Sequence, residues 1–89
     1  MAVTSRQIDR AIELAQGFGA TRLLLFGSAL ENPAQAHDLD LACDGVPGWE
    51  LYRLSARIEE ELGVPLDMVP LSPPTRFTRH IEARGKVLL

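Results

Sequence analysis

Cysteine, aromatic residues and long apolar runs are scarce in this sequence, and each scarcity excludes a class of protein. The single cysteine, Cys43, cannot form an internal disulfide, which predicts a reducing compartment. No apolar run approaches the ~18 residues of a membrane span, and residues 1–6 lack the apolar stretch of a signal peptide. We therefore expect a cytoplasmic protein that does not associate with membranes.

Basic residues are also few. The 89 residues hold 9 Lys and Arg against 12 Asp and Glu, which gives a net charge of −3. A nucleic-acid-binding surface is normally basic, and 6% aromatic residues are too few for a base-stacking platform. The length predicts one domain over residues 1–89, with room for one core and one site but not for a second substrate-binding domain.

The local patterns alternate between helix and strand. Thr4 as N-cap and Gln7 three residues later form a capping box, so a helix should begin there and end at Gly17 or Gly19. The remaining predicted elements are a strand over 22–26, a loop over 27–37, a strand over 38–43, a helix over 49–62, a strand over 64–69, and a helix that Ser72 caps and that stops near Gly85. This order predicts an α/β (α+β) fold, with a small mixed sheet of three or four strands and helices packed on it.

The most informative stretch is a glycine–serine turn followed by two aspartates. Gly27 and Ser28 end an apolar run, and Asp38 and Asp40 follow after a short polar loop. Side chains on a strand alternate faces, so Asp38 and Asp40 should point the same way and repel each other unless a cation lies between them. Carboxylate oxygens suit Mg²⁺, and a glycine-containing turn can bring backbone N–H groups close to a phosphate. The pattern predicts a metal–nucleotide site.

A third carboxylate, Asp67, lies inside the apolar strand over 64–69. A charge there is costly unless it is paired or binds a metal. If this strand lies beside the strand over 38–43, Asp67 can complete a cluster with Asp38 and Asp40. Three carboxylates can hold two divalent ions, and Asp67 is then the candidate general base for an attacking hydroxyl.

These motifs resemble the minimal nucleotidyltransferases, the smallest members of the DNA polymerase beta-like superfamily. The similar segments are the strand end at residues 26–28, the Asp-x-Asp strand at 38–41, the third-Asp strand at 66–69, and the C-terminal Ile…Gly-Lys-Val pattern at 81–88. Asp-x-Asp alone is a weak signal, whereas the combination at this spacing is fairly specific. The resemblance covers nearly the whole chain and implies the nucleotidyltransferase fold.

The resemblance also implies roles for individual residues. Gly27 and Ser28 would hold the phosphates of ATP or another NTP, and Asp38, Asp40 and Asp67 would be catalytic and would bind Mg²⁺. The implied reaction is transfer of NMP, with release of pyrophosphate, to a hydroxyl of a partner protein. Short members of the family are commonly antitoxins that adenylylate a HEPN-type toxin, so we expect an oligomer or hetero-oligomer.

The loop after Ser28 departs from the family pattern. Ala29 stands where an arginine is usual, Asn32 replaces a second glycine, Glu31 adds a negative charge, and His37 replaces a Ser or Thr. These changes favour an alternative function, a catalytically weak or inactive antitoxin that neutralises its partner by binding. Lys86, Arg76 and Arg79 are the basic residues that could replace the missing arginine.

Each site residue also has a purely structural interpretation. Asp38 and Asp40 could form a solvated strand end, and Asp67 could face water at a sheet edge beside prolines. Gly27 could serve only as a turn residue and Ser28 only as a cap. A fragment of a larger enzyme acting on antibiotics or tRNA is a further interpretation, disfavoured because the chain has no acceptor domain.

Overall fold

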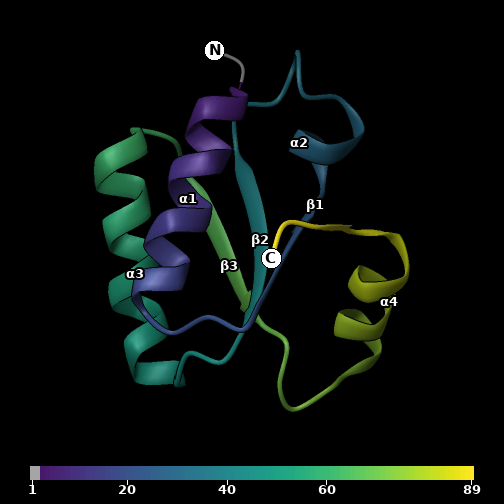
Figure 1. Ribbon diagram of the computed structural model, residues 1–89. Helices are drawn as coiled ribbons and strands as arrows, with labels where there is room; N and C mark the ends of the chain where they lie inside the picture. The colour runs from purple at the N-terminus through teal and green to yellow at the C-terminus, as the bar shows by residue number, and fades with distance from the viewer. Residues whose placement is uncertain (1–2) are drawn as a thin grey trace.

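The computed structural model describes residues 3–89 and folds into a four-stranded sheet with helices on both faces (Figure 1). The structure keeps the predicted order helix, strand, strand, helix, strand, helix, and adds a short helix between the first two strands and a short strand near the C-terminus. The elements are α1 (Ser5–Gly17), β1 (Arg22–Phe26), α2 (Ser28–Glu31), β2 (Leu39–Asp44), α3 (Gly48–Leu62), β3 (Leu66–Pro70), α4 (Arg76–Arg84) and β4 (Lys86–Val87).

The sheet is mixed and has the strand order β3-β2-β1-β4. β1 pairs antiparallel with both β2 and β4, whereas β2 and β3 pair in parallel. Parallel neighbours need a crossover connection, and α3 supplies it. The predicted fold class is therefore confirmed, and β3 lies at an edge of the sheet, as its flanking prolines suggest.

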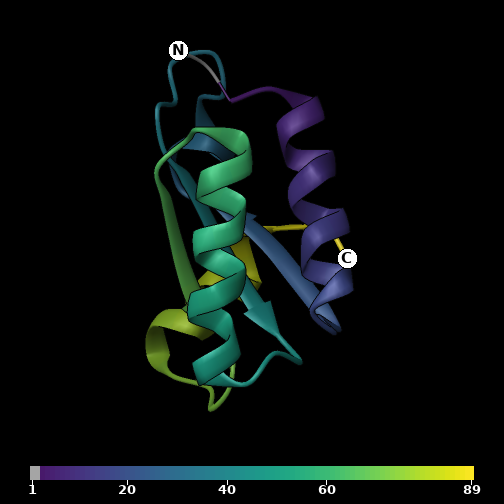
Figure 2. The same cartoon turned by 90° about the vertical axis from the view of Figure 1, so that its left-hand side faces the viewer.

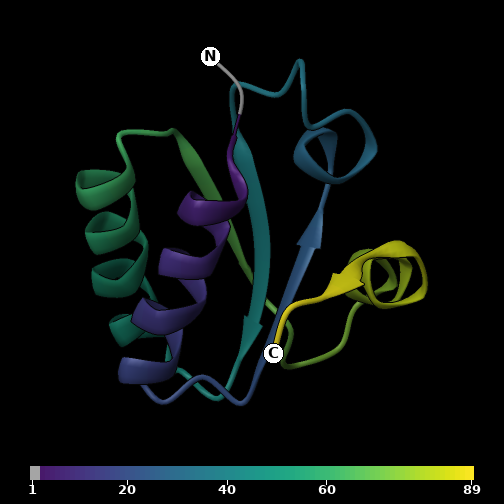
Figure 3. The same ribbon diagram turned by 45° about the horizontal axis from the view of Figure 1, so that its top comes forward.

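The two faces of the sheet belong to different hydrophobic clusters, because strand side chains alternate. Leu23, Leu25, Leu39 and Leu41 are buried in the larger cluster, together with apolar residues of α1 and α3. Leu24 belongs to the smaller cluster on the opposite face, which also contains Ala42, Leu71 and Ile81 of α4. Figures 1 and 2 show α1 and α3 side by side on one face, and Figure 3 shows α4 apart from them.

The predicted capping box of α1 and the predicted C-terminal ends of α1 and α3 are confirmed. The backbone N–H of Gln7 donates to the Thr4 hydroxyl at 3.2 Å, and the Gln7 side chain accepts from the Thr4 N–H at 2.8 Å. α1 ends at Gly17, and α3 ends before Gly63, whose φ of +66° is left-handed. Left-handed φ is the conformation that glycine adopts most readily at a helix end.

Three local predictions differ from the structure. The segment predicted as a loop contains the helix α2, which is only four residues long and too short to give a periodic pattern. The cap of α4 is Thr75 rather than Ser72, because Thr75 and Thr78 exchange hydrogen bonds as a capping box. The strand predicted over 64–69 lies at Leu66–Pro70.

Other side chains are placed as follows. Cys43 is buried, as expected, and burial together with the Asp44 charge raises the pKa of its thiol to about 11. Trp49 and Tyr52, aromatic residues that suit a core or a partner surface, are 71% and 82% exposed and therefore lie outside the core. None of the helices within residues 3–89 has the length and hydropathy needed to cross a membrane.

Candidate functional site

The glycine–serine turn begins where β1 ends, and it touches the second aspartate. Gly27 has a φ of +73°, a backbone conformation that L side chains rarely adopt. A Cβ placed on Gly27 would collide with the Oδ2 atom of Asp40. Both the conformation and the close approach therefore require glycine, and they hold the backbone of residues 27–28 against the Asp40 carboxylate.

Asp40 lies at the centre of three strands. It pairs with Phe26 of β1 on one side and with Asp67 of β3 on the other. Paired residues on neighbouring strands are about 5 Å apart at the backbone and project to the same face. The structure therefore brings Asp40 and Asp67 together, because β3 lies beside β2 as the predicted cluster requires. It also places Asp40 beside the glycine–serine turn.

Asp38 is close to this pair but lies outside the strand. β2 begins at Leu39, so the prediction that Asp38 and Asp40 share one strand face is wrong in detail. The strand starts at Leu39 because its N–H donates to the carbonyl of Pro65 at 2.9 Å, the first bond to the β3 segment. Asp38 is exposed in the bend before that bond.

The three aspartates line one surface hollow of about 270 Å³. Its lining also contains Glu59, which the sequence analysis does not place at the site. Glu59 is exposed and lies in the last turns of α3, close to the start of β3. The short connection from Gly63 to Pro65 is the signal that could have placed it, because so short a link keeps the helix end next to the strand start. The lining residues are Asp38, Asp40, Glu59, Pro65, Leu66 and Asp67.

The hollow is electrostatically uncompensated. Partial burial raises the pKa of the Asp40 carboxyl, and the charges of Asp67 and Asp38 raise it further. No basic side chain is among the lining residues of the hollow in the described chain. The C-terminus of α3, the negative end of its dipole, lies on the same side of the molecule as the hollow. A bound cation would reduce the repulsion between these carboxylates and would also interact favourably with the negative end of the α3 dipole.

The donor chemistry fits Mg²⁺, with Asp40 and Asp67 as the paired ligands and Asp38 beside them. Across residues 3–89, no three His, Cys, Asp or Glu side chains are already gathered into a metal-binding group. Mg²⁺ usually takes one or two carboxylates and completes its shell with water and substrate phosphates. The Asp40–Asp67 pair meets that requirement without a closed protein cage.

The departures in the Gly27–Asn32 segment have a structural counterpart. Ala29 is buried in the main core cluster at the start of α2, so the position at which the minimal nucleotidyltransferases usually have an arginine faces the interior in this chain. Glu31 is exposed in the same short helix. Lys86 is one of the basic residues that could replace the missing arginine. It lies in β4 and pairs with Leu25, close to the end of β1.

Together the sheet order, the strand-end turn and the paired aspartates define a small domain of the nucleotidyltransferase fold. Solved structures confirm this fold. The chain matches the structure of the MntA–HepT toxin–antitoxin over 97% of its length and 72% of the matched chain, with a TM-score of 0.75 and 17% identity.

Two further structures match over similar lengths. One is a Shewanella oneidensis complex of a tri-AMPylated HEPN toxin with its MNT antitoxin, with 18% identity, a TM-score of 0.74, and 94% and 70% of the two chains covered. The other is a toxin–antitoxin structure with AMP-PNP, with 19% identity, a TM-score of 0.77, and 98% and 73% covered. At these identities the likeness establishes the fold. No protein-family model and no curated protein sequence matches the chain.

Proposed function

We propose that this protein is a Mg²⁺-dependent nucleotidyltransferase that moves AMP from ATP to a hydroxyl of a partner protein, a HEPN-type toxin that it inactivates as an antitoxin. The observation that carries the proposal is the contact of Gly27 with Asp40, which in turn pairs with Asp67. This arrangement would allow a phosphate at the glycine–serine turn and a metal ion at the carboxylate pair to share one site. The structures with an AMPylated toxin and with AMP-PNP support the same assignment.

Each residue has a distinct task in this mechanism. The backbone at Gly27 and Ser28 receives the terminal phosphates, because glycine permits close approach there. Asp38, Asp40 and Asp67 would hold Mg²⁺, which neutralises the triphosphate and lowers the pKa of an attacking hydroxyl. Asp67, exposed at the sheet edge, accepts the proton of that hydroxyl as general base.

A direct transfer assay tests this proposal. The full chain is incubated with labelled ATP, Mg²⁺ and the protein encoded by the neighbouring reading frame. We expect label on that protein, and we expect transfer to fall at least about 100-fold in Asp67→Asn, the range typical of a lost general base. Equal transfer by the wild type and by the double variant Asp38→Asn with Asp40→Asn would contradict the proposal.

A second function, neutralisation by binding alone, is favoured by one specific observation. Ala29 is buried where family members usually carry arginine, and the lining of the acidic hollow is all acidic or apolar among the described residues. A toxin that is bound and inhibited without acquiring label, equally by the wild type and by Asp40→Asn, would support this alternative. Tight Mg²⁺-dependent ATP binding that disappears in Asp67→Asn would count against it.

A further inference from the structure

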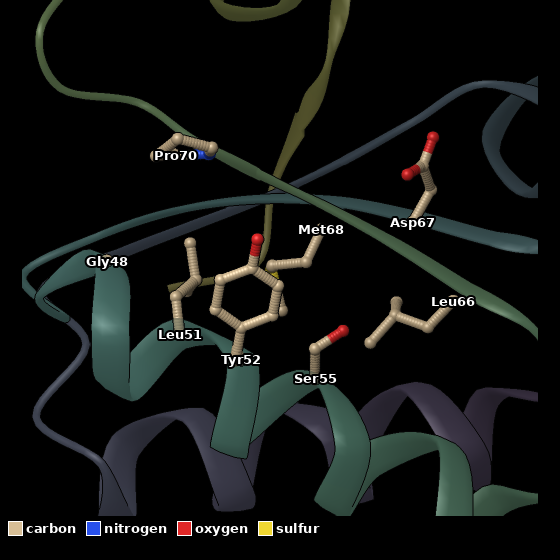
Figure 4. Close-up of a pocket in the computed structure, with 8 residues that line it drawn as sticks. All are labelled: Gly48, Leu51, Tyr52, Ser55, Leu66, Asp67, Met68 and Pro70. Carbon is tan, nitrogen blue, oxygen red and sulfur yellow. The ribbon is translucent and has the colours of Figure 1, made fainter.

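A second, larger hollow lies next to the aspartates, between α3 and the edge strand β3 (Figure 4). Its volume is about 430 Å³. In Figure 4 the Tyr52 ring and the Leu66 side chain face this hollow, whereas the Asp67 carboxylate points to the other side of β3. We call this hollow the edge groove, and its lining is mostly apolar: Gly48, Leu51, Tyr52, Ser55, Leu66, Asp67, Met68 and Pro70.

The main chain along this groove is at the open edge of the sheet. The Leu39 N–H donates to Pro65, and the Leu71 N–H donates to Cys43, both at 2.9 Å. These two bonds fix the hydrogen-bonding pattern of the parallel ladder, in which the N–H and C=O groups of successive residues point alternately towards and away from the neighbouring strand. The N–H and C=O groups of Leu66 and Met68 consequently face away from β2. An incoming strand would find two donors and two acceptors there.

Tyr52 gives the groove an exposed apolar wall. Its side chain is 82% exposed, although it borders a hollow lined by Leu66 and Met68. An aromatic ring in such a position gains free energy when a partner covers it. Trp49, one turn earlier on α3, is also exposed at 71% but does not line the groove.

Leu66 and Asp67 line both hollows, so the groove and the acidic hollow adjoin at the start of β3. We infer that the edge groove binds the acceptor protein through an extended segment. This segment adds to β3 as a fifth strand and places its hydroxyl at Asp67. The inference rests on the proposed function and adds the mode by which the acceptor is recognised.

The chemistry of the segment follows from its surroundings. β3 has five residues, which span roughly 17 Å, so about five extended residues fit beside it. Apolar side chains would face Tyr52 and Met68, and a basic side chain would face Glu59 and the aspartates. A protein segment suits this place better than a nucleic acid, because within the described part of the chain the lining residues of both hollows include no basic side chain to pair with backbone phosphates.

In the transfer step the acceptor oxygen attacks the α-phosphorus of ATP. A new P–O bond forms to the acceptor, the bond from the α-phosphorus to the bridging oxygen breaks, and pyrophosphate leaves with that electron pair. The hydroxyl proton passes to the Asp67 carboxylate. The segment in the edge groove is what holds the hydroxyl in line for this attack.

The test uses the full chain labelled with ¹⁵N and a probe peptide of eight residues. The peptide alternates valine with polar residues, and its polar set carries one tyrosine with an arginine two residues away on each side, so that the tyrosine and both arginines share one strand face. Two matched peptides carry N-methyl groups on one or the other set of alternate amides, because this blocks strand pairing on a single edge. Tyr52→Ala tests the groove, and Trp49→Ala is its matched control. Mg²⁺–ATP binding is measured separately for every variant.

We expect the peptide to shift the amide signals of Leu66 and Met68. Methylation of one alternate set, but not of the other, should weaken binding at least tenfold. Tyr52→Ala should weaken it by about tenfold, as expected for an uncovered aromatic ring, and Trp49→Ala should leave it unchanged. ATP binding should be the same in both variants.

Several results would overturn the inference. These are no binding of the peptide at millimolar concentration, equal effects of the two methylated peptides, or equal effects of Tyr52→Ala and Trp49→Ala. An RNA oligonucleotide that shifts Leu66 and Met68 where the peptide does not would also overturn it. Peptide binding that persists in a protein unable to bind Mg²⁺–ATP would support the groove and contradict the proposed function instead.

Discussion

Gly27 is the residue whose backbone lies directly against the Asp40 carboxylate. Its positive φ and its approach to Asp40 both exclude a side chain. Gly27→Ala should therefore lower the free energy of unfolding by about 1–3 kcal/mol, the usual cost of a strained backbone conformation. It should also abolish ATP binding, since the Asp40 carboxylate must move. Urea unfolding and calorimetry measure the two effects.

Gly17 provides the matched control for this substitution. It lies in α1, a Cβ placed on it would have no neighbour within 4 Å, and it has no left-handed φ. Gly17→Ala should raise the free energy of unfolding by about 0.5–1 kcal/mol through better helix propensity. Equal effects of the two substitutions on stability would contradict the account of Gly27.

Asp40 should make the metal-free protein less stable as pH rises. Its folded pKa lies above the ordinary aspartate value of 3.8, so the folded state binds the proton more tightly than the unfolded state. The stability it contributes is complete below pH 3.8 and is lost as pH rises through the folded pKa. Asp40→Asn should remove this loss and make the metal-free protein more stable than the wild type at pH 7.

Chemical unfolding between about pH 3 and 7, without divalent ions, measures this effect. Asp9→Asn, an exposed position on α1, is the control and should keep the wild-type pH profile. Added Mg²⁺ should stabilise the wild type and leave Asp40→Asn unaffected, because only the wild type keeps the carboxylate pair. An Asp40→Asn protein that is less stable than the wild type at pH 7 without metal would be inconsistent with like-charge repulsion.

At the scale of elements, the start of α4 shows where two local signals compete. Ser72 followed by Pro73 and Thr75 followed by Thr78 both have the residue types of a helix start. The structure uses Thr75, whose hydroxyl accepts from the Thr78 N–H at 3.1 Å, and Thr78 is buried. A single sequence does not rank the two signals, because the choice depends on the burial of Thr78.

This assignment gives a prediction for α4. Thr75→Ala should cost about 1 kcal/mol of stability, the typical value of a lost N-cap. Ser72→Ala should change stability by less than about 0.5 kcal/mol, as at other surface positions. Thermal unfolding of the two variants shows which residue caps α4. A larger loss of stability in Ser72→Ala than in Thr75→Ala would mean that Ser72 is the cap.

Other elements could be predicted because their signals are local. The capping box at Thr4 and the glycine after Leu62 fix the ends of α1 and α3 within the chain itself. Two other features could not be predicted from local signals, because they depend on contacts between distant segments. These features are the pairing of β4 with β1 and the position of Glu59 in the acidic hollow. The predicted strand begins at Asp38, whereas the observed β2 begins one residue later, because the first hydrogen bond of the ladder belongs to Leu39.

At the scale of the whole molecule, the topology gathers the site at one end of the sheet. β1 ends there, and β2, β3 and the C-terminus of α3 meet it (Figure 1). Three segments that are separated in sequence thus supply the residues to which we assign phosphate binding, metal binding and the role of general base. The sequence predicts that Asp67 needs a partner or a metal, because an aspartate inside an apolar strand is otherwise costly. Its pairing with Asp40 is predicted only on the condition that the two strands are neighbours, and the parallel pairing of β2 with β3 meets that condition.

The central claim is that Gly27–Ser28 and the aspartates form one nucleotide–metal site. A crystal structure with AMP-PNP and Mn²⁺ tests it most directly, because manganese is located by its anomalous signal. We expect a manganese peak between the carboxylates of Asp40 and Asp67, with the terminal phosphates against the backbone of residues 27–28. A nucleotide bound elsewhere, or a manganese ion that contacts neither carboxylate, would contradict it.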